Sequence, residues 1–239
     1  NTKSIIVPAK NEEGNLEELI ERIPKFSSKS EIIIVCGKSK DNTLKKAFQL
    51  SEQFPEKNIS VYEQKTKGKA GAVFEVIDYC DGELIAILDA DISVDPETLT
   101  DFFEIIENGY ADFVNGTRLI YGKEKKAMRI LNTLGNIFFQ FIISLVIKQK
   151  LTDSLCGTKI FKKDDLGLLK KWQKLNFVKD PFGDFDLIFS AAYSGQKILE
   201  YPVHYRSRKY GYTQISRFRD GWKLLSYFLI SFYKFNVSK

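Results

Sequence analysis

The sequence predicts an α/β protein in which helices flank a mostly parallel β-sheet. Short runs rich in Ile and Val alternate with longer amphipathic stretches through the first half of the chain, and this order is typical of repeated βα units. The 239 residues, of which 44% are hydrophobic, can bury a sizeable core. We therefore expect a single domain over residues 1–239.

The apolar runs have the length of strands, and the stretches between them repeat their apolar residues at helical spacing. Strands are predicted at residues 4–7, 31–35, 59–62, 84–88 and 112–115. Helices are predicted at residues 12–23, 41–54, 71–79 and 96–107. Because parallel α/β sheets bind ligands at the carboxyl ends of their strands, the residues that follow each strand are the candidates for a functional site.

Two segments in the second half of the chain combine apolar and basic residues. A helical stretch at residues 127–147 ends in the apolar run IFFQFIISLVI, and residues 222–235 read WKLLSYFLISFYKF. The apolar run is shorter than the roughly 20 residues that a membrane span needs. Each segment is therefore either a core helix or a helix in a membrane interface. Nearby basic residues favour the interface: Arg129, Lys148, Lys150, Arg217, Arg219 and Lys223.

The cysteine, histidine and charge content limits the metal sites and ligands that the chain can be expected to have. The three cysteines are odd in number and far apart, which fits neither a disulfide framework nor a paired-cysteine zinc site, so a reducing, cytoplasmic compartment is expected. His204 is the only histidine, and a bound metal is therefore expected on carboxylates. From Lys197 onward, nine basic and two acidic residues give a net charge of +7, which favours phosphate ligands. No nucleic-acid partner is expected, because no nucleic-acid-binding motif is present.

One apolar strand ends in two carboxylates that are separated by a single residue. In LIAILDAD, Asp89 and Asp91 follow the strand predicted at 84–88. Two carboxylates at a strand end can bind one divalent cation, such as Mg²⁺ or Mn²⁺, which also bridges the phosphates of a nucleotide. The alternative is that Asp91 caps the helix that Asp95 and Pro96 begin.

Two further turns carry residues suited to a nucleotide. In IIVPAKNEEGN the first strand ends at Pro8, and Asn11 and Glu12 precede a helix, although a capping box uses the same residue types. In KTKGKAGA, Gly68 and Lys69 open a helix whose backbone N–H groups and positive charge suit a phosphate. A solvated basic turn is the alternative there.

The order of these motifs along the whole chain resembles that of the family 2 glycosyltransferases. Eight segments carry the resemblance: VPAKNEE, VCGKSKDNT, KGKAGAV, LDAD, NGTR, DSLCGTKIF, FGDFDL and RSRKYGYTQISRF. The chain is most similar to the branch of dolichol-phosphate mannose synthases and bacterial polyprenyl-phosphate sugar transferases. The resemblance implies a Rossmann-like GT-A fold, with a nucleotide-sugar half at residues 1–118, an acceptor half at 119–212 and a C-terminal amphipathic helix at 213–239.

On the donor side, the resemblance implies roles for individual residues. It places Asp89 and Asp91 on Mg²⁺ or Mn²⁺ at the diphosphate. It places these further residues along the nucleotide-sugar: Pro8, Lys10, Glu12, Val35, Gly37, Lys69, Ala90, Arg118, Arg206 and Arg208. The metal and the arginines would stabilise the negative charge that develops on the leaving nucleoside diphosphate.

On the acceptor side, the resemblance implies Asp153, Thr213 and Arg217, with Asp184 and Asp186 as catalytic candidates. A sugar hydroxyl as acceptor would need one of these carboxylates as general base. A polyprenyl phosphate, with a second pKa near 6, is already an anion at neutral pH and needs no base. In that case Asp184 or Asp186 would position the acceptor or pair with Lys159 or Lys162.

Three positions depart from the family. Cys36 stands where relatives carry an acidic residue at the nucleobase, and a thiol is a weak donor. Thr213 and Gln214 replace a Ser-Lys pair, and Ser93 replaces a longer polar residue. The prediction is an inverting transfer of a hexose from a UDP- or GDP-sugar to polyprenyl or dolichyl phosphate by an enzyme bound peripherally to the cytoplasmic membrane face. The alternatives are a family 2 enzyme with a soluble glycan or protein acceptor, and a non-catalytic nucleotide-sugar-binding protein.

Overall fold

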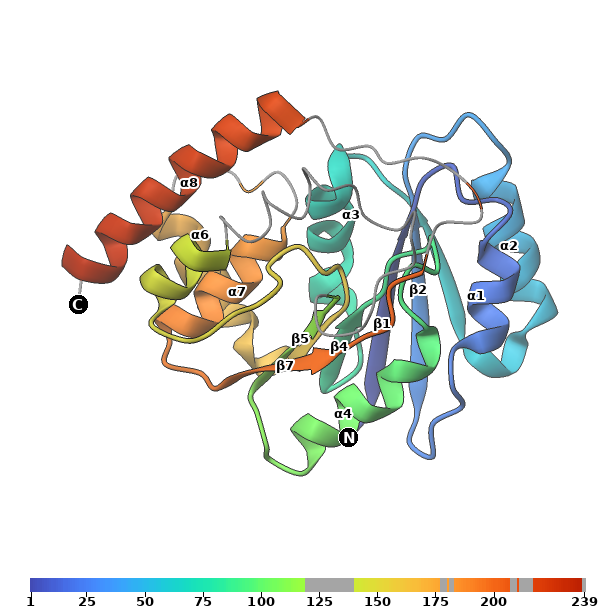
Figure 1. The fold of residues 1–239 in the computed structure, drawn as a ribbon. Coiled ribbons are helices and arrows are strands. Elements are labelled where there is room, and N and C mark those ends of the chain that lie inside the picture. Colours follow the sequence, from blue (N-terminus) through green and yellow to red (C-terminus); the bar gives the residue numbers. More distant parts are fainter. Residues whose placement is uncertain (119–139, 177–179, 181–182, 207–209, 211–216, 238–239) are drawn as a thin grey trace.

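Helices cover both faces of one continuous β-sheet (Figure 1). The computed structural model describes residues 1–118, 140–176, 180, 183–206, 210 and 217–237, the last range without the side chains of 217–224 and 237. The α/β architecture predicted from the sequence is confirmed.

The sheet has seven strands in the order β3-β2-β1-β4-β6-β5-β7. Their bounds are β1 Lys3–Ala9, β2 Ser30–Cys36, β3 Ile59–Glu63, β4 Leu84–Ile87, β5 Phe113–Thr117, β6 Lys159–Lys162 and β7 Ile198–Pro202. The pairs β1–β2, β2–β3, β1–β4 and β5–β7 are parallel, whereas β6 is antiparallel to β4 and β5. The five predicted strands are confirmed. The two strands without a prediction, β6 and β7, come from the second half of the chain, and β6 lies between two strands of the first half.

The helices of the first half and the C-terminal helix are confirmed with shifted ends, whereas α6 and α7 had no prediction. Their bounds are α1 Leu16–Arg22, α2 Thr43–Gln53, α3 Gly68–Val76, α4 Leu99–Glu107, α6 Leu166–Leu175, α7 Asp184–Tyr193 and α8 Arg217–Val237. The first helix begins later than predicted because residues 13–15 form a turn. Residues 140–147 are helical, as predicted, and residues 127–139 of that segment include none that the structure describes.

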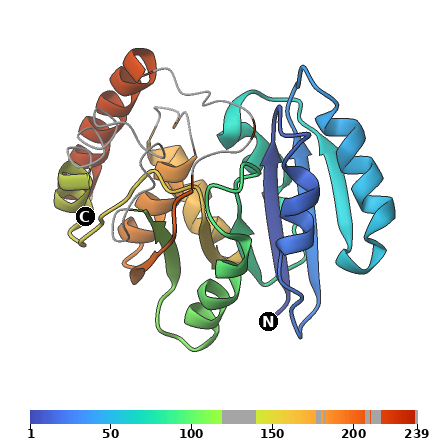
Figure 2. The same ribbon diagram turned by 45° about the vertical axis from the view of Figure 1, so that its right-hand side comes forward.

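The sheet carries a hydrophobic core on each face, because successive strand residues point to opposite sides. In β1, Ile5 and Val7 belong to the core that α1, α2 and α4 cover, and Ile6 belongs to the core that α3, α6 and α7 cover. Figure 2 shows α1 (blue) packed in front of β1 and β2. Burial on both faces explains why these strands read as continuous apolar runs rather than as alternating ones.

The C-terminal helix α8 lies beside α6 and α7 (Figure 1). A cluster of aromatic side chains from the three helices fixes its inner side. Phe228 of α8 meets Phe185 of α7 edge-on, with ring centroids 5.1 Å apart. Phe235 contacts both Trp172 (5.6 Å) and Phe189 (5.8 Å). Aromatic pairs in these geometries add to the stability that burial alone provides. The inner side of the C-terminal helix is therefore part of the core.

The outer sides of the two amphipathic segments are exposed and apolar. Each of the following side chains is more than half exposed: Phe141 and Leu145 in the helical stretch before β6, and Leu229, Phe232 and Tyr233 in α8. The helix α8 thus has one face in the core and a second, apolar face on the surface. Across the part of the chain that the structure describes, the helices are too short or too polar to span a membrane.

Candidate functional site

The parallel strands β1, β2 and β4 end side by side at one edge of the sheet. The register pairs Ala9 with Cys36 and Ile6 with Ile87, and the N–H of Leu88 continues the β4 pairing by donating to the carbonyl oxygen of Ile6 (3.0 Å). Eight residues predicted to bind the donor therefore gather along this edge: Pro8, Lys10, Glu12, Val35, Gly37, Asp89, Ala90 and Asp91.

Two residues at the end of β2 shape this edge. A Cβ at Gly37 would lie 2.9 Å from Oε1 of Gln64 and 3.4 Å from Cβ of Lys10, so the glycine lets both side chains approach. Cys36 is fully buried, and burial raises the pKa of its thiol to about 12. The thiol is therefore neutral at physiological pH and offers only a weak hydrogen bond.

The two carboxylates after β4 differ in environment. The side chain of Asp89 is 34% exposed, whereas Asp91 is 6% exposed and its Oδ1 accepts the N–H of Ser93 (2.9 Å). Between them and the next helix, Ile92 has a φ of 52°, a strained conformation for a β-branched residue that only the surrounding structure can enforce. The turn that leads into α4 has Asp95 as its N-cap residue, so Asp91 is not the helix cap.

A chain of alternating charges links this carboxylate pair to α7. Nζ of Lys69, in the first turn of α3, lies 2.7 Å from Asp89 and 3.8 Å from Oδ1 of Asp184. Nζ of Lys159 donates to the same Oδ1 (2.8 Å). Burial alone would lower the pKa of Lys69, but the negative charges of Asp184 and Asp89 have the larger effect, so the pKa is raised. Gly157 packs against the Asp89–Lys69 pair, where a Cβ would lie 2.5 Å from Nζ of Lys69.

Arg118, predicted on the donor side, and Asp153, predicted on the acceptor side, are bonded to each other. The guanidinium donates to both carboxylate oxygens, at 2.6 and 2.8 Å, and the backbone N–H of Arg118 donates to Oδ2 (3.0 Å). Asp153 is fully buried. Burial alone would lower the pKa of Arg118, but the Asp153 carboxylate has the larger effect, so the pKa is raised. The ring of Tyr205 lies beneath the guanidinium, 5.0 Å away.

The structure places Asp186 away from this charge chain. Asp184 and Asp186 are two residues apart in a helix and therefore point to different sides. Oδ1 of Asp186 accepts the hydroxyl of Tyr227 in α8 (2.6 Å), and Oδ2 accepts Nε2 of Gln173 (3.1 Å). Burial raises the pKa of this carboxyl group. The contacts of Asp186 anchor α8 on α6 and α7.

The pairing of Asp184 with Lys159 predicts a large effect on stability. Asp184→Ala is expected to lower the free energy of unfolding by about 3–5 kcal/mol, because it leaves a fully buried ammonium group without its carboxylate. Denaturation in urea, followed by circular dichroism, measures the change. Asp164→Ala removes an exposed carboxylate in the turn after β6 and is the matched control, expected to change stability by less than about 0.5 kcal/mol. Equal effects of the two substitutions would contradict a stabilising ion pair.

The remaining predicted residues belong to the C-terminal part of the chain. Arg206 donates two hydrogen bonds to Asp95, at 2.8 and 3.0 Å. Arg208 and Thr213 lie outside the described residues, and the structure gives only the backbone of Arg217. Sequence reasoning missed Asp95 and Gly157 as site residues. Gly157 belongs to the motif DSLCGTKIF, which is the one signal that pointed to it.

The donor set at the end of β4 fits Mg²⁺ or Mn²⁺. These cations prefer hard oxygen ligands, and Mg²⁺ is commonly bound through one or two carboxylates together with substrate phosphates. Asp89 and Asp91 supply two carboxylates. Among the described residues, no group of three or more acidic, His or Cys side chains forms a cage that would hold a metal by itself. A metal at this site would therefore depend on oxygen atoms of the ligand.

The fold and the carboxylate pair define a protein of the GT-A class. Glucosyl-3-phosphoglycerate synthase from Mycobacterium tuberculosis, solved with Mn²⁺, uridine diphosphate and glucosyl-3-phosphoglycerate, superposes with a TM-score of 0.68. The match covers 95% of this chain and 79% of that chain, at 16% identity. The chain belongs to glycosyl transferase family 2, which matches residues 4–168.

Curated relatives of the chain carry names of dolichyl-phosphate sugar transferases. "Dolichol-phosphate mannosyltransferase" of Pyrococcus furiosus is 36% identical over 121 residues, which are 50% of this chain and 34% of that protein. "UDP-N-acetylglucosamine--dolichyl-phosphate N-acetylglucosaminyltransferase" of Methanococcus voltae is 30% identical over 181 residues, 70% of this chain and 72% of that protein. The chain thus spans about a third of the length of the first of these relatives.

Proposed function

We propose that this chain is a metal-dependent, inverting hexosyltransferase that carries a sugar from a UDP- or GDP-sugar to a polyprenyl or dolichyl phosphate. The observation that carries the proposal is the pair Asp89 and Asp91 after β4, with the ammonium group of Lys69 beside Asp89. The names of the two relatives support the acceptor class.

On the donor side, Asp89 and Asp91 would hold Mg²⁺ or Mn²⁺, which would neutralise the charge of the diphosphate when bound. Lys69 lies beside this pair and adds a fixed positive charge. Interactions that strengthen as the nucleoside diphosphate departs lower the barrier for transfer. Gly37 and Val35 would line the nucleobase, where the neutral thiol of Cys36 replaces an acidic group.

The acceptor-side carboxylates favour an anionic acceptor. Asp184 already accepts the ammonium group of Lys159 and lies 3.8 Å from that of Lys69. Asp153 accepts hydrogen bonds from Nε and Nη2 of Arg118, and Asp186 accepts two hydrogen bonds in the core between α6, α7 and α8. All three carboxylates thus already accept hydrogen bonds or ion pairs from neighbouring side chains, whereas a general base must have an oxygen directed at the acceptor hydroxyl. A phosphate needs no general base, so it fits this site better than a sugar hydroxyl.

The exposed apolar sides of α8 and of residues 140–147 support action at a membrane surface. Phe141 and Leu145 precede Lys148 and Lys150, and Phe232 and Tyr233 precede Lys234. Apolar side chains that enter the interface and lysines that meet anionic lipid head groups together bind a peripheral protein. The proposal places the protein on the cytoplasmic face of the membrane.

Release of nucleoside diphosphate in the presence of a lipid acceptor tests this proposal. The protein is incubated with Mn²⁺ or Mg²⁺, a panel of UDP- and GDP-sugars, and vesicles with or without a polyprenyl phosphate. We expect release with one donor, only in the presence of metal and only with the phosphate-bearing vesicles. Release that is equal with soluble glycans would favour the soluble-acceptor enzyme, and nucleotide binding without release would favour the non-catalytic binding protein.

A further inference from the structure

Residues 203–206, which we call the crossing segment, lead from the end of β7 to the loop after the carboxylate pair. The first residue of the segment donates its N–H to the last carbonyl group of β5 (2.9 Å). At its other end, Tyr205 forms an antiparallel bridge with Val94, and the N–H of Arg206 donates to the carbonyl oxygen of Ser93 (3.0 Å). The segment therefore joins β7, the last strand of the sheet, to residues 92–95 after the carboxylate pair, which we call the metal loop.

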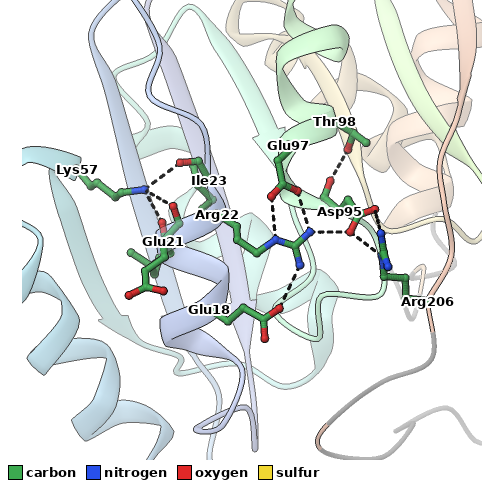
Figure 3. Close-up of polar contacts among 10 residues, drawn as sticks. Glu18, Glu21, Arg22, Ile23, Lys57, Asp95, Glu97, Thr98 and Arg206 are labelled. Atoms are coloured by element: carbon green, nitrogen blue, oxygen red, sulfur yellow. Dashed lines mark hydrogen bonds and ion pairs between the residues drawn. The ribbon is translucent and has the colours of Figure 1, made fainter.

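Two arginines from different parts of the chain meet on the carboxylate of Asp95 (Figure 3). Arg206 donates to both oxygens, at 2.8 and 3.0 Å, and Nη2 of Arg22 in α1 donates to Oδ1 (2.7 Å). Arg22 is also bonded to Glu97 (2.8 and 2.9 Å) and Glu18 (3.2 Å). Burial alone would raise the pKa of Asp95, but the hydrogen bonds from both arginines have the larger effect, so the pKa is lowered. This carboxylate thus ties α1, the metal loop and the crossing segment together.

Tyr205 in the crossing segment and Tyr210 beyond it each contact a part of the site. The ring of Tyr205 supports the guanidinium of Arg118 at 5.0 Å. Four residues beyond Arg206, the ring of Tyr210 covers Gly14, where an added Cβ would lie 2.9 Å from a ring carbon. The hydroxyl group of Tyr210 lies 3.4 Å from Oδ2 of Asp41 in the loop after β2. The contact of Tyr205 with Arg118 depends on where the crossing segment lies.

We propose that Asp95 is a positioning residue for the nucleotide-sugar, which acts by fixing the crossing segment against the loop that follows Asp89 and Asp91 at the end of β4. This role rests on the proposed function. A bidentate carboxylate–guanidinium pair fixes direction as well as distance, while an ion pair on a half-exposed arginine adds little to stability. The pair of Asp95 and Arg206 therefore contributes chiefly to the placement of the site. Arg206 acts through this pair and through its backbone.

Asp95→Asn tests the role, because it keeps the shape of the side chain and the backbone carbonyl that caps the turn at Thr98 (3.1 Å). We expect the KM for the nucleotide-sugar to rise about tenfold with a much smaller change in kcat and in the melting temperature. Glu97→Gln is the matched control, because it neutralises another carboxylate that Arg22 contacts and leaves the Asp95–Arg206 pair. The control is expected to keep the KM of the wild type.

Two further measurements separate positioning from direct contact. Arg206→Gln and the double variant Asp95→Asn/Arg206→Gln are expected to show the same KM as Asp95→Asn, because all three lose the same pair. Trypsin is expected to cut the Asp95→Asn variant about tenfold faster after Arg206, since cleavage follows local opening. This readout does not depend on activity.

Different results would overturn different claims. An unchanged KM and an unchanged cleavage rate in Asp95→Asn, with normal binding of nucleoside diphosphate measured by calorimetry, would overturn the positioning role alone. A much larger KM effect in Arg206→Gln than in Asp95→Asn would overturn it in favour of direct contact between Arg206 and the donor. If the wild type binds no nucleoside diphosphate with Mn²⁺, the proposed function fails and this role fails with it.

Discussion

Asp91→Asn is expected to lower the rate of sugar transfer by about 10²–10³-fold, because it removes a charge that would hold the metal at the developing negative charge. The amide oxygen can still accept the N–H of Ser93, so the loop and its strained Ile92 should keep their conformation. Single-turnover transfer measures the rate. Mn²⁺ binding in the presence of UDP or GDP, followed by electron paramagnetic resonance, should weaken in parallel.

Asp81→Asn is the matched control for this substitution. Asp81 is exposed and precedes β4, whereas Asp91 follows it, so both changes neutralise a carboxylate near the same strand. The control is expected to transfer sugar and bind Mn²⁺ as the wild type does. If Asp91→Asn retained full activity and full Mn²⁺ affinity, the carboxylate pair could not be the metal site.

The strands of the first half could be predicted because a strand that is buried on both faces has a short run of Ile and Val residues. The two later strands carry a weaker signal. β6 is a four-residue strand, KIFK, that begins and ends in lysine, and Lys159 would be expected in solvent. It is fully buried because Asp184 comes from α7 to neutralise it. Because this partner belongs to helix α7, the sequence around Lys159 has no hydrophobic periodicity that would predict its burial.

The order of motifs located the loops of the site, but it could not predict which side chains pair. Asp184 and Asp186 are equivalent in the sequence, and only the rotation of the helix sends one to Lys159 and the other to Tyr227. The bonds of Arg118 to Asp153 and of Arg22 to Asp95 join residues that are remote in the chain. Distance in sequence removes every spacing signal, so these pairs follow only from the fold.

Gly157→Ala is expected to lower the transfer rate by about 10²-fold, because a methyl group there would enter the space of the Asp89–Lys69 pair. Its Cβ would lie 2.5 Å from both Cγ of Asp89 and Nζ of Lys69, and closer still to Oδ2 of Asp89. The carboxylate must therefore shift. A displacement of about 1 Å at a reacting centre can cost 10²-fold in rate, and the affinity for Mn²⁺ with UDP or GDP should fall with it.

Gly167→Ala provides the matched control, because Gly167 lies in α6 and an added Cβ there would meet no heavy atom of the described residues within 4 Å. That substitution should leave transfer unchanged and stabilise the helix by about 0.5–1 kcal/mol. Thermal unfolding of both variants separates a local displacement from a general loss of stability. If Gly157→Ala transferred sugar and bound Mn²⁺ like the wild type, Asp89 would tolerate displacement, and its assignment as a metal ligand would have to be abandoned.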